Sequence, residues 1–73
     1  MSKLPDVSTR RVLAALRRAG WEVHEGRKHY KLLHLTKPGA LTVPRARTLK
    51  RGTLRAIIRQ AGLTVEQFID LCQ

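Results

Sequence analysis

Cysteine, aromatic residues and long hydrophobic runs are all scarce in this sequence of 73 residues. The only cysteine is Cys72, so an intramolecular disulfide is excluded and a reducing compartment such as the cytoplasm is the expected location. No apolar run is long enough to span a bilayer, and Met1 to Asp6 lack the apolar stretch of a secretory signal. The length permits one domain, residues 1–73, and we expect residues 1–7 to be disordered or loosely attached.

Acidic residues are also few, and their absence is concentrated in one interval. The sequence has 15 Lys and Arg against 5 Asp and Glu, for a net charge of +10, and no acid lies between Glu25 and Glu66. The cations of that interval are Arg27, Lys28, Lys31, Lys37, Arg45, Arg47, Lys50, Arg51, Arg55 and Arg59. Cations on a small fold repel one another, and a polyanion relieves that repulsion and gains entropy from released counterions. The charge favours a polyanion such as a nucleic acid over a merely solvated surface or an anionic membrane.

Capping signals predict helices at both ends of the chain. Residues 8–19 predict a helix with Ser8 as N-cap and Gly20 as its stop, and its apolar face is Val12, Ala15, Leu16 and Ala19. Residues 53–61 predict a second helix that Gly62 ends. Thr64 and Gln67 form the capping box of a last short helix, whose predicted buried face is Val65, Phe68, Ile69 and Cys72. Cys72 is thus interpreted as a packing residue and not as a nucleophile.

Between these helices the sequence alternates as strands do. Strands are predicted over residues 21–25, over residues 29–35 after a turn near Gly26, and over residues 40–43, where Pro44 ends the ladder. In the first of them the side chains on one face are Trp21, Val23 and Glu25. The order α-β-β-β-α-α predicts an α+β fold of the double-stranded-RNA-binding type. In that fold a three-stranded antiparallel sheet carries the helices on one face.

Histidine is the residue type here that suits acid–base chemistry, because it titrates near neutral pH. His29 differs from His24 and His34 because it lies where a strand leaves a turn, inside the basic run Arg27-Lys28-His29-Tyr30-Lys31. Nearby cations favour the neutral imidazole that a general base requires, and they would hold a phosphate beside the ring. From the residues alone, a plain hydrogen bond or phosphate contact is the more common role of such a histidine, so both interpretations stay open.

Other catalytic and metal-binding patterns are missing. Three scattered histidines and one terminal cysteine lack the ligand spacing of a metal site, and no Gly-rich phosphate loop is present. A helix-turn-helix is excluded because the first predicted helix is followed by strands. We therefore expect no metal and no cofactor.

Four segments together resemble the HicA-type toxins, small mRNA-cleaving endoribonucleases of bacterial toxin–antitoxin pairs. They are residues 12–21, the basic turn that ends in His29, residues 41–44, and residues 49–63 with a Gly-Thr-Leu helix entry and a Gln-Ala-Gly-Leu exit. The resemblance extends from about residue 8 to residue 71. Arg27 and Lys28 stand where the family usually has Gly-Ser, and the glycine is displaced to Gly26.

The resemblance implies a metal-independent endoribonuclease, an mRNA interferase, with His29 as its catalytic residue and growth arrest as the outcome. It also implies mRNA as the substrate and a HicB-type antitoxin as the protein partner that covers the active site. We expect phosphate binding and charge stabilisation from Arg27, Lys28 and Lys31. We expect an extension of the RNA path along Arg45, Arg47 and Lys50. Tyr30 either stacks on a base or packs in the core, and Trp21 is assigned to the core.

Two non-catalytic alternatives explain the same charge. One is an RNA-binding module of the same fold, which fits the altered turn before His29. The other is an interaction module whose basic face meets an acidic protein.

Overall fold

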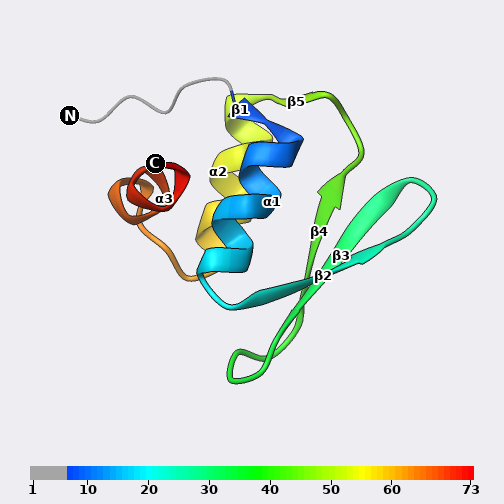
Figure 1. Ribbon diagram of the computed structural model, residues 1–73, viewed down its shortest axis with the longest axis horizontal. Helices are drawn as coiled ribbons and strands as arrows, with labels where there is room; N and C mark the ends of the chain where they lie inside the picture. Colours follow the sequence, from blue (N-terminus) through cyan, green and yellow to red (C-terminus); the bar gives the residue numbers. More distant parts are fainter. Residues whose placement is uncertain (1–6) are drawn as a thin grey trace.

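The computed structural model describes residues 7–73, with the main sheet on one side of the molecule and the helices on the other (Figure 1). The elements in chain order are β1 (Val7–Ser8), α1 (Thr9–Arg18), β2 (Trp21–Glu25), β3 (His29–His34), β4 (Ala40–Pro44), β5 (Thr48–Leu49), α2 (Arg51–Gln60) and α3 (Val65–Cys72). The predicted α+β fold, with a three-stranded antiparallel sheet and the helices on one face, is confirmed. The short strands β1 and β5 were not predicted, and they pair with one another.

Local capping decides where two of the helices begin. The Ser8 side chain accepts a hydrogen bond of 3.2 Å from the Arg11 amide, which satisfies a free donor of the first turn of α1. At α3, the Thr64 hydroxyl accepts from the Gln67 amide at 3.1 Å, and the Gln67 side chain accepts from the Thr64 amide at 2.9 Å. Gly20, which follows α1, has a φ of 98°, the left-handed conformation that glycine adopts without strain.

The start of α2 differs from the prediction. The helix begins at Arg51 and not at Thr53, and Lys50 in the N-cap position makes no side-chain capping bond. The Leu54 amide donates to the Lys50 carbonyl at 2.9 Å, so the backbone closes the first turn by itself. A turn closed without a capping side chain leaves no signal in the sequence, and this explains the error.

The sheet has the strand order β2-β3-β4, and its register defines two faces. The inner face carries the pairs Trp21 with His34 and Leu32 with Leu41. The outer face carries the row of His24, Lys31 and Thr42 and, at the end near the β2–β3 turn, the pair of His29 and Pro44. Pro44 is the last residue of β4, as expected for a residue without an amide proton.

A single apolar core lies between the inner face of the sheet and the helices. α1 packs against β2 and α3, while α2 packs against β4 and α3, and Figure 1 shows α3 on the side of the helices away from the sheet. The largest fully buried side chains are Phe68, Leu16, Leu32, Leu41, Leu49, Leu54, Val12 and Val43. Trp21 is 3% exposed, which agrees with its assignment to the core.

Val7 was expected in a loosely attached N-terminus, and this is wrong for that residue. Val7 is buried and pairs with Leu49 of β5, because its side chain adds to the apolar core. The rest of the segment, residues 1–6, lies outside the described residues.

The inner face of β2 becomes progressively more exposed from the start of the strand to its end. Trp21 at the start is buried, Val23 is half-buried, and Glu25 at the end is exposed, although the three share one face. The sheet therefore contacts α1 closely at one end and diverges from it at the end that carries the β2–β3 turn.

Candidate functional site

His29 is the first residue of β3 and is exposed on the outer face of the sheet. The alternation of β3 puts its side chain on the same face as Lys31 and Leu33, and its paired residue on β4 is Pro44. The helices cover only the inner face of the sheet, so a large substrate such as RNA can reach an imidazole on the outer face.

The turn before His29 is tightly closed. The Gly26 amide donates to the His29 carbonyl at 2.9 Å, and a β-carbon on residue 26 would come within 2.7 Å of that oxygen. Only glycine fits there without moving the backbone. Gly26 therefore allows the backbone of residue 26 to approach the His29 carbonyl closely. The other two residues of the turn, Arg27 and Lys28, have long cationic side chains.

Arg45, the residue after β4, holds this turn from the neighbouring strand. Its amide donates to the Lys28 carbonyl at 3.2 Å, and its guanidinium donates to the Gly26 carbonyl at 2.8 Å. The same guanidinium lies over the ring of Tyr30, 5.0 Å from the centroid. These contacts tie the backbone of the turn just before His29, and the Tyr30 ring just after it, to the end of β4, so the histidine is presented from a fixed turn.

The cations nearest to His29 in the chain are open to a ligand. Arg27, Lys28 and Lys31 are exposed, and within residues 7–73 their side chains make no hydrogen bond or ion pair. Charges without acidic partners are free to bind phosphate oxygens and to stabilise charge that develops on phosphorus.

The other two histidines have partners. His24 on the outer face lies 2.9 Å from the Glu22 carboxylate. His34 on the inner face accepts at Nδ1 from the Thr36 amide at 3.1 Å, so the proton is on Nε2, which donates to the Ala19 carbonyl at 3.2 Å. The His34 ring also packs edge-on against Trp21 with centroids 5.1 Å apart. His34 therefore joins the end of α1 to the sheet and is not available for acid–base chemistry.

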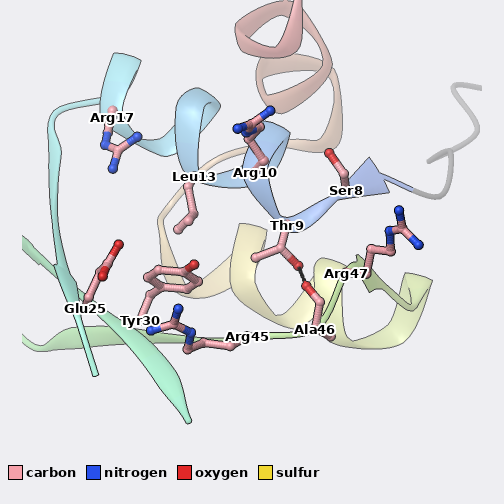
Figure 2. Close-up of a pocket in the computed structure, with 10 residues that line it drawn as sticks. All are labelled: Ser8, Thr9, Arg10, Leu13, Arg17, Glu25, Tyr30, Arg45, Ala46 and Arg47. Carbon is pink, nitrogen blue, oxygen red and sulfur yellow. Dashed lines mark hydrogen bonds between the residues drawn. The ribbon is translucent and has the colours of Figure 1, made fainter. Parts of the chain in front are cut away.

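A groove opens where the sheet diverges from α1. Its volume is about 570 Å³, and Figure 2 shows it between α1 on one side and Glu25, Tyr30 and Arg45 on the other. The cations that line it are Arg10, Arg17, Arg45 and Arg47. The structure thus brings Arg45 and Arg47 together. It separates them from His29 and Lys31, which lie on the opposite face of the sheet, and from Lys50, which precedes α2 and does not line the groove.

Sequence reasoning missed Arg10, Arg17 and Glu25 as candidate binding residues. Glu25 did leave a signal, because it occupies the inner-face position of a strand after Trp21 and Val23. A carboxylate in that position indicates that the inner face is uncovered there. Arg10 and Arg17 gave no such signal in the sequence, since many helices of basic proteins carry arginine off their buried face.

Cys72 is half-buried in α3. Burial raises the pKa of its thiol, and the guanidinium groups of Arg11 and Arg18 lower it in part. Cys72 packs against the apolar core, as predicted. Residues 7–73 contain no group of three or more His, Cys, Asp or Glu side chains placed to hold a metal ion. Neither α1, α2 nor α3 is long and apolar enough to cross a membrane.

Comparison with known families agrees with this layout. The profile of a family described as HicA toxin of bacterial toxin-antitoxin matches residues 9–63, which include α1, the whole β2-β3-β4 sheet and α2. This chain belongs to the HicA toxin family. As a HicA-family toxin it is one half of a toxin–antitoxin pair, and the pairing implies an antitoxin as partner. No curated protein matches the sequence.

Proposed function

We propose that this HicA-family toxin is a metal-independent endoribonuclease that cleaves mRNA, with His29 as its general base or general acid. The observation that supports the proposal is the exposed imidazole on a fixed turn, next to three cations that are unpaired within residues 7–73. Those cations are Arg27, Lys28 and Lys31.

The reaction needs only groups of this kind. A base removes the proton of a ribose 2′-hydroxyl, the freed oxygen attacks the adjacent phosphorus, and the 5′-oxygen leaves with a proton from an acid. The fragments would carry a 2′,3′-cyclic phosphate and a 5′-hydroxyl. Lys31 on the same face of β3, and Arg27 and Lys28 in the turn, would stabilise the charge on the phosphoryl oxygens.

A HicB-type antitoxin is the proposed partner, and the outer face of the sheet is where we propose that it binds. Leu33 is 43% exposed on the strand that carries His29, and Leu35 just beyond it is fully exposed. Contiguous exposed apolar surface is a mark of protein contact surfaces, and these two leucines are the exposed large hydrophobic residues within residues 7–73. A partner that extends from these two residues along the outer face of β3 would also cover His29, and this would silence the toxin in the cytoplasm.

The proposal is tested by comparing the variants His29→Ala and His24→Ala on a defined mRNA in the presence of EDTA. Both remove an exposed imidazole from the outer face, so His24→Ala controls for the loss of an imidazole from that face and for folding. We expect His29→Ala to lower the cleavage rate about 10²- to 10⁴-fold with RNA affinity nearly unchanged. We expect His24→Ala to cleave like the wild type and His29→Ala to relieve the arrest of growth on expression.

Other outcomes identify the alternatives. A wild-type protein that binds RNA tightly and never cuts it would be a non-catalytic RNA-binding module. A protein that binds neither RNA nor its fragments, yet captures an acidic protein, would be an interaction module.

A further inference from the structure

The groove between α1 and the end of the sheet is separate from the face that carries His29. β3 alternates across the sheet, so Tyr30 lines the groove while His29 points to the other side. The two faces meet at the β2–β3 turn, residues 26–28. A strand of RNA that is cut at His29 can enter the groove by passing over this turn.

The walls of the groove are held in place. Thr9 at the start of α1 donates its hydroxyl to the Ala46 carbonyl and its amide to the Arg47 carbonyl, the latter at 3.1 Å. Arg45 is bound to the β2–β3 turn and lies over Tyr30. The loop of residues 45–47 therefore keeps a constant position relative to α1, so the groove is already formed before a ligand arrives.

Three of the four cations that line the groove are unpaired within residues 7–73. Figure 2 shows Arg10 and Arg17 projecting from α1 and Arg47 from the facing loop. Within the part of the chain that the structure describes, the side chains of these three arginines make no hydrogen bond or ion pair. Their mutual repulsion is unrelieved in the free protein, and bound phosphates would relieve it.

Glu25 and Tyr30 narrow the choice of ligand. Both lie at the end of the groove away from Arg47 (Figure 2). A carboxylate accepts hydrogen bonds from ribose hydroxyls and base amino groups, which the side chains of an acidic peptide do not offer, and an aromatic ring offers a surface to a base. A volume of about 570 Å³ has the size of a small-molecule site, so it admits a nucleotide and not a duplex.

We propose that this groove binds the backbone of single-stranded RNA beside the scissile phosphate, with Arg10, Arg17, Arg45 and Arg47 on the phosphates and Glu25 facing the nucleoside. The inference rests on the proposed function for the position of the cut, but the groove would bind RNA whether or not the protein cuts it. It adds Arg10 and Arg17 to the RNA path and makes the substrate continue around the end of the sheet.

The test measures the salt dependence of RNA binding by fluorescence anisotropy, in the His29→Ala background, with a labelled single-stranded RNA between about 50 and 200 mM salt. The groove variant is Arg10→Ala with Arg17→Ala. Its matched control is Arg55→Ala with Arg59→Ala, which removes the same charge from exposed positions of α2 that do not line the groove.

We expect the groove variant to flatten the slope of log K against log salt by about 1.4, or about 0.7 for each lost phosphate contact. The control variant, Arg55→Ala with Arg59→Ala, should change this slope much less. Equal changes in both variants would mean that only net charge matters, and the inference would be overturned. As an independent check, Glu25→Gln removes the charge of the one carboxylate that lines the groove but keeps an oxygen that can accept a hydrogen bond. The repulsion of phosphates is lost, so Glu25→Gln should tighten binding about two- to fivefold. Weaker or unchanged binding in Glu25→Gln would also contradict the inference.

The following outcomes distinguish a failure of this inference from a failure of the proposed function. If the wild type cuts no RNA while the groove variant still flattens the slope, then the groove stands and the nuclease proposal fails. If the wild type cuts RNA and the groove variant binds like its control, then only the groove inference fails. A labelled oligo-glutamate peptide, or a duplex RNA, that loses more affinity than single-stranded RNA in the groove variant would assign the groove to a different ligand.

Discussion

The amide of Gly26 and the carbonyl oxygen of His29 are joined by a hydrogen bond of 2.9 Å across a turn with no space for a side chain at residue 26. A β-carbon there would lie 2.7 Å from the oxygen, so Gly26→Ala must open the turn and shift His29. We expect cleavage to fall about tenfold to a hundredfold, because small displacements of a catalytic group are costly. The measurement is kcat/KM on an RNA substrate.

The matched control for Gly26→Ala is Gly52→Ala. A β-carbon at residue 52 meets nothing within 4 Å, and the residue lies in the first turn of α2. Alanine is the better helix former, so we expect Gly52→Ala to stabilise the fold by about 0.5 to 1 kcal/mol and to leave cleavage unchanged. If Gly26→Ala cleaves as fast as Gly52→Ala, the turn does not position His29.

Arg45 should not be replaceable by lysine. The guanidinium donates to the Gly26 carbonyl and lies over Tyr30 at the same time, and a lysine ammonium cannot do both. Arg45→Lys keeps the charge of the groove, so we expect RNA affinity to change little while kcat falls. Arg45→Ala should lower both. Wild-type kcat in Arg45→Lys would show that Arg45 acts through its charge alone.

A substrate test checks the proposed attack by the 2′-hydroxyl. An RNA with a single 2′-deoxy nucleotide on the 5′ side of the cleaved bond lacks the nucleophile, so we expect no cut there and normal cuts elsewhere. Mass spectrometry of the fragments should find 2′,3′-cyclic phosphates. Cleavage at the deoxy position would mean that water is the nucleophile.

Substitutions of two neighbouring arginines of α1 should have different effects, one on the stability of the fold and the other on RNA binding. Arg18 donates to the carbonyls of Leu71 and Gln73, at 2.6 and 2.8 Å, and so caps the end of α3. Because the site is exposed, we expect Arg18→Ala to cost only about 1 kcal/mol in the free energy of unfolding. Arg17→Ala should leave the unfolding midpoint unchanged and weaken RNA binding. Equal midpoints for the two variants would contradict the capping role of Arg18.

The pH dependence of stability should carry a contribution from Cys72. Burial raises the pKa of this thiol, so the folded state holds the thiol proton more tightly than the unfolded state does. The stabilisation is complete below the pKa of the unfolded thiol and is lost as the pH rises through the folded value. Urea unfolding between about pH 8 and pH 10 should therefore show a steeper loss of stability for the wild type than for Cys72→Ala. Parallel curves would mean that the thiol is already solvated.

The elements that could be predicted from sequence are those whose signals are local. The side chains of Ser8, Thr64 and Gln67 accept hydrogen bonds from amides three residues away, so their spacing reports where α1 and α3 begin. Gly20 reports where α1 ends, because its own backbone is left-handed. The strand predicted over residues 29–35 also rests on a local signal. Side-chain direction in a strand has a period of two residues, so adjacent residues such as His29 and Tyr30 lie on opposite faces.

Other features depend on contacts between distant parts of the chain. The pairing of Val7 with Leu49 joins two strands too short to be recognised in sequence. The hold of Arg45 on the Gly26 carbonyl also follows from register, which a local pattern does not contain.

The charge of +10 and the position of one histidine in a basic turn were determined by the sequence by itself. The sharing of those charges between two faces was decided only by the tertiary structure. The sheet packs on α1 at Trp21 and diverges from it at Glu25, and this divergence turns Arg10 and Arg17 from scattered helix cations into the wall of a groove. The physical reason is that apolar burial ends where the inner face of β2 becomes polar, and the space left there is lined by whatever cations the facing helix carries.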